Sequence, residues 1–196
     1  RVQDSEKAHG RALMMLRFLS ANPFTRGILS LLYRPRKKLT VKCFGQTYNH
    51  PFGNAAGLDK RAEALRGWEA IGLSFIEIGG VTEHEQEGNP KPRMFRASSS
   101  LSLVNRMGFN NPGSIKVASK LKQHFSRHGS PNIPLWANLG KSKITPLDQA
   151  PGDYAATMDR LWEYCDTFVI NVSSPNTPNL RELQHDDALE SIIKAC

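Results

Sequence analysis

The chain has 196 residues, of which 39% are hydrophobic and 22% are charged, so its composition is that of a globular domain and not of a disordered one. Its three cysteines, Cys43, Cys165 and Cys196, are widely spaced, which argues against a disulfide scaffold or a zinc motif and favours reduced thiols in a reducing compartment. No apolar run approaches the ~20 residues that span a bilayer, and the start lacks the apolar region of a secretory signal.

Positive charge is concentrated at the start of the chain. Residues 1–42 contain ten Lys or Arg and two acidic residues, whereas residues 43–196 contain sixteen of each sign, so the net charge of +8 comes from the first segment. A basic segment attracts anionic lipid headgroups or nucleic acid phosphates. The chain begins at Arg1 without Met and stops at Cys196 inside an apolar-periodic stretch, so we expect it to be part of a longer protein.

The basic segment is predicted to form two short amphipathic helices. Apolar side chains recur at helical spacing over residues 5–20, and Asn22 and Pro23 provide an N-cap and a first-turn proline for a second helix that ends near Arg34. Without a spanning segment, such a pair is typical of helices that lie on a membrane surface. The alternative is that both helices pack on the main domain. The apolar positions are Ala12, Met15, Leu16 and Leu19 in the first helix and Phe24, Ile28, Leu31 and Leu32 in the second.

After residue 40 strands and helices alternate. We expect a hairpin over residues 40–48, a helix capped by Asp59, extended loops over residues 81–110, and a helix from residue 111 with Ile115 facing inward. Short connections between alternating strands and helices indicate a parallel α/β sheet, and a doubly wound sheet and a half-complete barrel both fit. The predicted strands cover residues 52–57, 74–78, 134–139 and 167–172, and the predicted helices cover residues 60–71, 111–125, 154–165 and 186–195.

Polar residues cluster just after the predicted strands, where parallel α/β proteins build their sites. Small residues and Lys60 follow the first strand, and a Ser- and Asn-rich stretch over residues 171–178 follows the fourth. An amide offers a donor and an acceptor together, so several amides, one cation and a hydroxyl suit a small anionic heterocycle. Each asparagine alone is more typical of a turn. The amides concerned are Asn105, Asn138, Asn171 and Asn176.

Three segments resemble signatures of class 2 dihydroorotate dehydrogenases. They are residues 55–60 (AAGLDK), 105–110 (NRMGFN) and 171–177 (NVSSPNT), and their order and separations also match. Residues 88–96 (GNPKPRMFR) look like the family's intervening loop, and the likeness runs from about residue 4 to the end. The resemblance implies a TIM (β/α)8 barrel of which about the first half is present.

This likeness also implies a division of the chain and a location. Residues 40–196 would be the N-terminal part of an FMN-binding barrel, and residues 1–39 would be helices that give access to the membrane and to a quinone. The protein would bind a membrane surface through residues 5–34. It would then be a peripheral protein on the cytoplasmic face of a bacterial inner membrane, or on the mitochondrial inner membrane of a eukaryote.

The chemistry that the resemblance implies is the oxidation of dihydroorotate to orotate in pyrimidine synthesis. FMN would take a hydride from C6 while Ser174 removes a proton from C5, and the electrons would pass to a quinone. A serine needs an activating environment, whereas the family's soluble-acceptor enzymes have a cysteine there, so Ser174 favours the quinone-dependent class. Thr177 and Phe109 would border the path of the proton. The substrate would contact Lys60, Asn105, Arg106, Met107, Gly108, Phe109, Asn171 and Asn176, and FMN would contact Ala56, Gly57, Leu58, Asp59, Lys60, Gly80, Asn138 and Asn171.

Neither nucleic acid nor a metal is expected as a partner. His124 and His128 have the spacing of a helical metal pair, but no third ligand is near, which favours a surface role. Gly80 stands where the family usually has Thr or Ser, which predicts the loss of one hydroxyl contact to the flavin.

The length of the chain bears on its activity. A complete barrel needs about 250 residues, and the phosphate site of such barrels commonly lies in the loops after strands seven and eight. We therefore expect the 196-residue chain alone to hold FMN poorly and to be inactive. Two alternatives stay open: a non-catalytic truncated barrel that acts as a membrane-binding or interaction module, and a related flavin dehydrogenase with a soluble acceptor.

Overall fold

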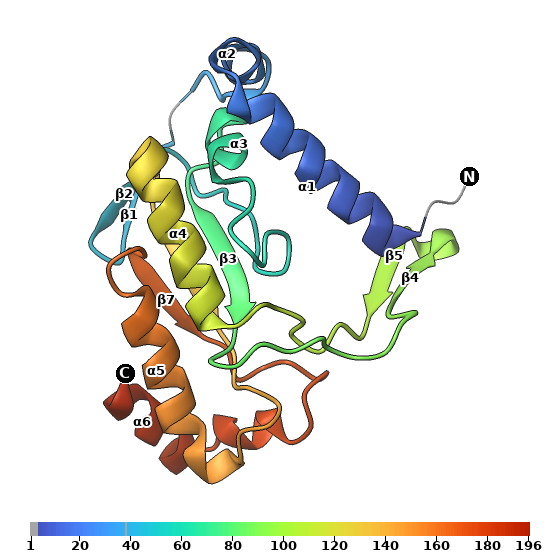
Figure 1. Cartoon of the computed structure of the whole chain (residues 1–196), viewed down its shortest axis with the longest axis vertical. Helices are drawn as coiled ribbons and strands as arrows, with labels where there is room; N and C mark the ends of the chain where they lie inside the picture. The colour runs from blue at the N-terminus through green and yellow to red at the C-terminus, as the bar shows by residue number, and fades with distance from the viewer. Residues whose placement is uncertain (1–3, 38) are drawn as a thin grey trace.

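The computed structural model describes residues 4–37 and 39–196 (Figure 1). Six α-helices and seven short strands follow one another in these residues. In chain order they are α1 (Ser5–Ala21), α2 (Pro23–Tyr33), β1 (Val41–Cys43), β2 (Gln46–Tyr48), α3 (Leu65–Ala70), β3 (Ile76–Val81), β4 (Met94–Ala97), β5 (Ser102–Asn105), α4 (Ser114–His128), β6 (Leu135–Leu139), α5 (Ala150–Leu161), β7 (Thr167–Ile170) and α6 (Asp186–Ala195).

A three-stranded parallel sheet in the order β3–β6–β7 organises the fold. Each pair of neighbouring strands is joined by a crossover that contains a helix, α4 after β3 and α5 after β6, which is the connection that parallel pairing requires. The two helices pack together on one face of the sheet (Figure 1). The expected parallel α/β organisation is therefore confirmed.

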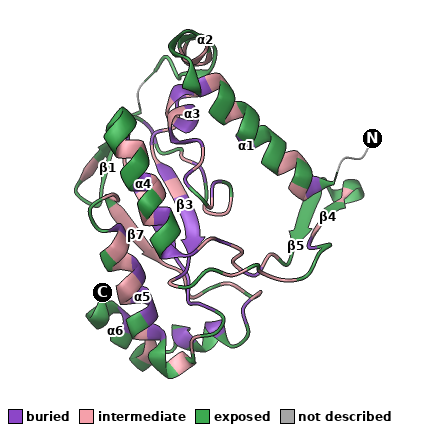
Figure 2. Cartoon of the chain, viewed as in Figure 1, coloured by how far each residue is buried: buried purple, intermediate pink, exposed green. Residues whose placement is uncertain are grey.

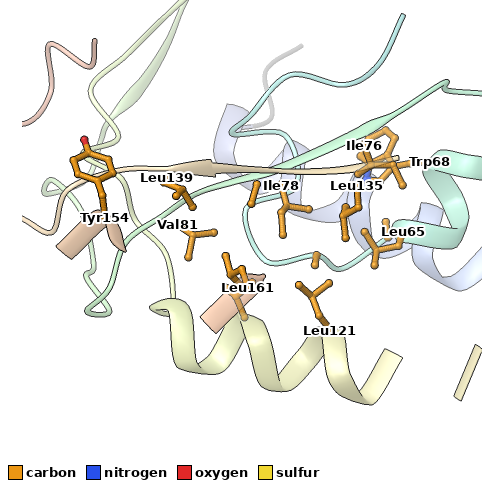
Figure 3. Close-up of a cluster of buried hydrophobic side chains, with 14 of the residues drawn as sticks. Leu65, Trp68, Ile76, Ile78, Val81, Leu121, Leu135, Leu139, Tyr154 and Leu161 are labelled. Carbon is orange, nitrogen blue, oxygen red and sulfur yellow. The ribbon is translucent and has the colours of Figure 1, made fainter. Parts of the chain in front are cut away.

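The face of the sheet toward α4 and α5 carries the hydrophobic core. Ile76 and Ile78 on β3 are completely buried and point toward Leu121 of α4 (Figure 3). Side chains alternate along a strand, so Glu77 between them points to the opposite face. Because each fully buried Leu or Ile contributes about 1.5–3 kcal/mol relative to exposure, the helix-covered face holds the sheet together. The opposite face carries polar groups and the aromatic Trp136.

The two N-terminal helices pack on the rest of the chain along one side only. Asn22 separates them and caps α2 by accepting the N–H of Phe24 at 2.8 Å. Leu16 of α1 fits against Gly67 of α3, where a Cβ would lie 2.5 Å from Leu16 Cγ. The other side of both helices is exposed (Figure 2). Many of the exposed side chains on it are large and apolar. No helix in residues 4–37 or 39–196 has both the length and the hydropathy to cross a bilayer. The large exposed apolar side chains are Met14, Met15, Phe18, Phe24, Ile28, Leu31, Leu32 and Tyr33.

The strand predicted over residues 52–57 is wrong. This segment runs beside β3, but the Asn54 side chain takes the place of a backbone partner: its Nδ2 donates to Glu77 O at 2.8 Å and its Oδ1 accepts from Glu77 N at 3.1 Å. The backbone bonds to β3 again at Gly57, whose N–H donates to Gly79 O, and Asp59 then forms a single parallel bridge with Ile78. A side-chain amide that imitates the backbone in this way competes with strand formation.

Two other predictions differ from the structure. Residues 81–110 are not all loop, because β4 and β5 form an antiparallel hairpin; its strands are mostly exposed, so no hydrophobic alternation marks them. Helix α4 begins at Ser114, and Ile115 is 66% exposed instead of facing inward. Ile115 and the buried Leu121 are six residues apart, which is about 1.7 turns, so they face different sides of the helix.

Candidate active site

A row of hydrogen bonds joins three side chains across the parallel sheet, and two of them lie at the carboxyl ends of β6 and β7. Asn138 of β6 donates through Nδ2 to Glu77 Oε1 of β3 at 2.9 Å, and its Oδ1 accepts from Nδ2 of Asn171, just after β7, at 3.0 Å. The other oxygen of Glu77 accepts the N–H of Ala56 at 3.1 Å. We call Glu77, Asn138 and Asn171 the amide row; it crosses all three strands on the face that the core leaves free.

The turn after the amide row carries the predicted base. Oδ1 of Asn171 accepts from the N–H of Ser173 at 3.1 Å and from its Oγ at 2.9 Å. The hydroxyl of Ser174 accepts the N–H of Asn176 at 3.3 Å, and Thr177 is buried in the same turn. The amide row and the Ser174 turn are therefore continuous, and they bring Asn138, Asn171, Ser174 and Asn176 to one edge of the sheet.

Lys60 is a half-buried cation whose hydrogen-bond partner is neutral. Its Nζ donates to Oδ1 of Asn110 at 2.5 Å. Burial first, and then the positive charge of Arg93, lower the pKa of Lys60 to about 8, although Glu6 acts in the opposite direction. At neutral pH Lys60 is mainly protonated and is suited to an anionic ligand.

The ring of Phe109 packs at the carboxyl ends of β3 and β6. Phe109 precedes Asn110, and its ring lies over Gly80 and Gly140, at the ends of β3 and β6. A Cβ at Gly80 would lie 2.7 Å from the ring and 3.5 Å from Oδ1 of Asn138. The missing side chain of Gly80, which was expected to cost a hydroxyl contact, makes room for this ring.

Gly80→Ala is expected to destabilise the protein by about 1–3 kcal/mol, because the added methyl group overlaps the Phe109 ring. The free energy of unfolding from urea titration checks this. Gly10→Ala is the matched control: a Cβ at Gly10 meets nothing within 4 Å in helix α1, so it should stabilise the protein by about 0.5–1 kcal/mol. Equal effects of the two substitutions would contradict the packing described for Phe109.

The segment over residues 56–59 follows the edge of β3. Gly57 donates its N–H to Gly79 O at 2.6 Å. Leu58 is partly exposed, whereas Asp59 is completely buried. The carboxylate of Asp59 accepts the N–H groups of Glu63 at 2.7 Å and Ala64 at 2.9 Å, and the indole N–H of Trp68 at 3.0 Å. Asp59 thus holds the turn that leads into α3 and explains why that helix starts at Leu65 and not near residue 60.

Asp59→Ala is expected to lower the free energy of unfolding by about 2–4 kcal/mol, because three buried or partly buried donors lose their acceptor. Chemical denaturation monitored by circular dichroism provides the measurement. Asp148→Ala, at an exposed carboxylate, should change stability by less than about 0.5 kcal/mol. A loss below about 1 kcal/mol for Asp59→Ala would show that these bonds contribute little.

Residues 105–108 are tied to the preceding loop. Asn105 is exposed and accepts the N–H of Met107 at 3.4 Å, and Gly108 O accepts from Gln86 at 3.1 Å. The guanidinium of Arg106 donates to Pro92 O and lies 5.8 Å from the centroid of the Phe95 ring. These contacts run along the β4–β5 hairpin and not toward the amide row.

Several polar residues of the site are not marked by any motif in the sequence. Glu77 organises the amide row, and Asn110 pairs with Lys60. Asn111 is buried and accepts the N–H of Thr82, which fixes the loop after β3. The one sequence feature that could have indicated Glu77 is its carboxylate inside the otherwise apolar segment FIEIGG.

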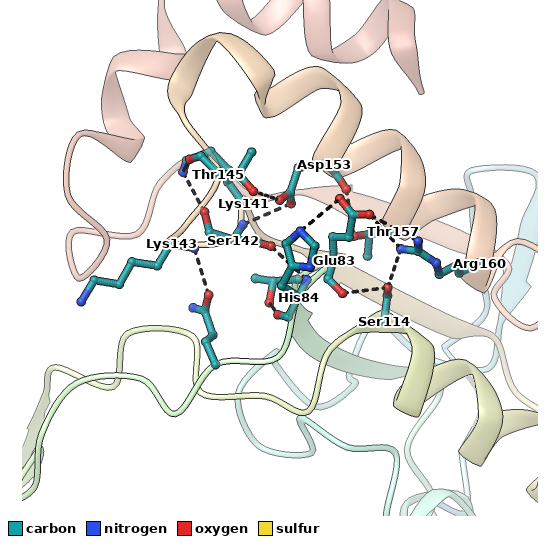
Figure 4. Close-up of polar contacts among 12 residues, drawn as sticks. Glu83, His84, Ser114, Lys141, Ser142, Lys143, Thr145, Asp153, Thr157 and Arg160 are labelled. Carbon is teal, nitrogen blue, oxygen red and sulfur yellow. Dashed lines mark hydrogen bonds and ion pairs between the residues drawn. The ribbon is translucent and has the colours of Figure 1, made fainter.

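A second polar cluster surrounds the loops after β3 and β6 (Figure 4). The side-chain atoms of Glu83, His84 and Asp153 that could bind a metal ion lie within 4.8 Å of one another. The two carboxylates already have protein donors, since Glu83 accepts from Arg160 at 3.3 Å and Asp153 accepts the N–H of Ser142 at 3.1 Å. The arrangement ties the loop after β3 to helix α5 and does not indicate a metal.

The amide row retains hydrogen-bonding capacity. An amide nitrogen has two donors. Within residues 4–37 and 39–196, Nδ2 of Asn138 and Nδ2 of Asn171 each bond one protein acceptor, so the second N–H of each is available to a ligand. Such donors fit the carbonyl oxygens and ring nitrogens at the edge of a planar heterocycle, and the small residues Ala56 and Gly57 leave space beside them.

Comparisons with known proteins identify the family of this chain. The family model for dihydroorotate dehydrogenase matches residues 38–196. The chain is 47% identical over 190 residues to the dihydroorotate dehydrogenase (quinone) of Gloeobacter violaceus, covering 97% of this chain and 52% of that protein. It is 46% identical over 191 residues to the protein of the same name from Thermus thermophilus, covering 97% and 55%.

A solved structure shows the same fold. The crystal structure of DHODH from Eimeria tenella in complex with ferulenol superposes with a TM-score of 0.85 at 35% identity, covering 99% of this chain and 50% of that one. The chain spans about half the length of the relatives that it matches. Its α/β fold is of the TIM-barrel type of these enzymes, and the chain belongs to the dihydroorotate dehydrogenase family.

Proposed function

We propose that the full-length protein oxidises dihydroorotate to orotate with FMN as cofactor and a quinone as electron acceptor. The observation that carries this proposal is the amide row, which presents the donors of Asn138 and Asn171 beside the Ser174 turn at the ends of β6 and β7. Family membership supplies the reaction class, and the relatives are named for the quinone-dependent activity.

The chain's own residues divide the chemistry between them. The C5–H bond of dihydroorotate breaks and its electron pair forms the C5–C6 double bond as a hydride leaves C6. Ser174 takes the proton from C5, and its own hydroxyl proton passes toward the buried Thr177. When bound, FMN supplies the acceptor for the hydride and the route by which electrons reach the quinone. Asn138 and Asn171 hold the two flat rings through their free N–H groups.

Lys60 provides the positive charge for the substrate. Dihydroorotate carries a carboxylate, and a half-buried ammonium with one neutral partner gains a charge-assisted hydrogen bond when that carboxylate binds. Phe109 covers the site between Lys60 and the amide row and limits the access of water.

We also propose that residues 40–196 are the first half of the barrel. Strand β7 lies at an open edge of the sheet, beside an apolar hollow of about 660 Å³ lined by Phe44, Trp136 and Phe168. Thr167 Oγ1 is buried there without a hydrogen-bond partner among the described residues. A further parallel strand paired with β7 would cover this edge and satisfy that hydroxyl.

The N-terminal region, residues 1–39, is proposed to attach the protein to a membrane surface as a peripheral protein, through residues 5–34. The exposed apolar sides of α1 and α2 support this proposal, because a monomeric soluble protein rarely exposes a large contiguous apolar surface. The same surface would admit a lipid-soluble quinone.

The test compares two purified proteins. The full-length protein should carry a flavin absorbance band and reduce a quinone in a dihydroorotate-dependent way. The 196-residue chain should bind FMN poorly and show no turnover, since it lacks half of the relatives' length. A full-length protein that binds vesicles but neither FMN nor orotate would instead support a non-catalytic membrane-binding module. Electron transfer to fumarate but not to quinone would support the soluble-acceptor alternative.

A further inference from the structure

A cationic hollow lies at the opposite end of the molecule's helical layer from the Ser174 turn. It has a volume of about 410 Å³ and is enclosed by α2, α3 and the C-terminal end of α4. Figure 1 shows α2 above α3, and α3 beside the upper end of α4. We call it the basic hollow; its charged and titratable lining residues are Arg26, Arg34, Arg66, Glu69, His124 and His128.

The charges of the basic hollow are not balanced by the protein. None of its three arginines has a carboxylate within ion-pair distance among the described residues. Arg26 donates to the backbone oxygen of Ser20 at 3.2 Å, which leaves its charge uncompensated. The one carboxylate, Glu69, accepts from Asn132 at 2.6 Å. Like charges that gather around one cavity favour the binding of an anion.

The histidines argue against a metal in the same hollow. The rings of His124 and His128 are 5.1 Å apart, but Nδ1 of His128 accepts a hydrogen bond from Arg66 at 3.1 Å. A nitrogen that faces a guanidinium is unsuited to a cation. Burial, and then the neighbouring His128, lower the pKa of His124, so its ring is neutral at pH 7 and offers an N–H to an anion.

An exposed apolar surface adjoins the basic hollow on the same helix. Arg26 and Ser30 of α2 line the hollow, whereas Phe24 and Leu31 are 76% and 80% exposed on the neighbouring side. A ligand that carries both an anionic group and acyl chains matches both surfaces, and a free phosphate ion matches only the first. The excess positive charge of residues 1–42 adds a general attraction to the same kind of surface.

We propose that the basic hollow binds the phosphate of an anionic phospholipid headgroup while the acyl chains of that lipid lie on the exposed face of α2. The proposal rests on the membrane association proposed above and adds the class of lipid and its site. Arg66 is the central residue, because it comes from α3 and joins the hollow to the body of the protein. If the lipid binds in a defined site, the loss of affinity on removing an arginine depends on whether that arginine lines the hollow. If the membrane only attracts the overall positive charge, every arginine contributes equally.

The experiment measures the binding of the full-length protein to vesicles by co-sedimentation. One vesicle is phosphatidylcholine alone, and the other contains 20% phosphatidylglycerol, a composition chosen for the assay. Arg66→Gln is compared with Arg127→Gln. Arg127 lies in the last turn of α4, near the hollow, but its side chain does not line it. Arg66→Gln should weaken binding to the anionic vesicles more than about tenfold, and Arg127→Gln by less than about fivefold, the effect of one unpaired charge of about 1 kcal/mol near a surface.

Equal losses for the two variants would overturn the site in favour of diffuse surface charge. Release of the protein from anionic vesicles by 10 mM inorganic phosphate at constant ionic strength would show that the hollow binds a free anion and not a lipid headgroup. If Arg66→Gln fails to fold, Arg26→Gln replaces it with the same expectation. Dihydroorotate oxidation with a soluble dye acceptor, measured on each variant, separates the two proposals: its absence in a protein that binds lipid through Arg66 contradicts only the proposed reaction.

Discussion

Ser174→Ala in the full-length protein is expected to slow the reduction of the flavin by dihydroorotate by about 10²–10⁴-fold, the usual contribution of a positioned base. The substrate should still bind, because the amide row and Lys60 are unchanged. Stopped-flow absorbance of the flavin under anaerobic conditions gives the rate, and its dependence on dihydroorotate concentration gives the affinity.

The control for this experiment is Ser126→Ala, which removes an exposed hydroxyl of α4 that bonds only the backbone of its own helix. Ser174→Cys offers a further comparison. A thiol titrates near pH ~8.5, so this variant should recover part of the rate, and the recovery should grow as the pH rises. A rate of flavin reduction that Ser174→Ala leaves unchanged would remove Ser174 from the role of base.

Lys60→Met is expected to weaken the binding of dihydroorotate by about 30–5,000-fold, because a partly buried charge pair lost on one side costs about 2–5 kcal/mol. The flavin should remain bound. Titration with orotate, followed by the change in the flavin spectrum, provides the dissociation constant. Lys122→Met, at an exposed position on α4, should leave that constant unchanged.

The pH dependence of the unmodified enzyme tests the same residue. The pKa of Lys60 is lowered to about 8, so Lys60 is protonated below that pH and loses its charge as the pH rises through it. The substrate carboxylate stays ionised over this range. The value of kcat/KM, which reports the free enzyme, should therefore fall above pH 8, and the fall should be absent in Lys60→Met. A profile that is flat to pH 10 would contradict the charge pair.

The apolar elements of the fold could be predicted from the sequence because their pattern is local. The helix predicted over residues 186–195 is Asp186–Ala195 in the structure, and the strands predicted over residues 134–139 and 167–172 contain β6 and β7. In buried strands and amphipathic helices, the spacing of the apolar side chains within the element indicates which residues are buried. Such elements need no knowledge of distant partners.

The predictions that differ from the structure depend on contacts between residues that are far apart in the sequence. The strand expected over residues 52–57 is prevented by two hydrogen bonds between Asn54 and the backbone of Glu77, 23 residues away. Their positions at the ends of predicted strands identified Asn138 and Asn171, but the bond between them and their link to Glu77 exist only once three strands are in register. Asp59 was expected at the cofactor, and the structure shows its carboxylate bonded to the turn before α3.

Lys60, the amide row and Ser174 are expected to surround one ligand, which a crystal structure of the full-length protein with FMN and orotate would reveal. We expect the orotate carboxylate within about 2.6–3.2 Å of Lys60 Nζ, and C5 of the same ring about 3–3.5 Å from Ser174 Oγ. Orotate bound in a different cavity, or in contact with Lys60 but remote from Ser174, would contradict it.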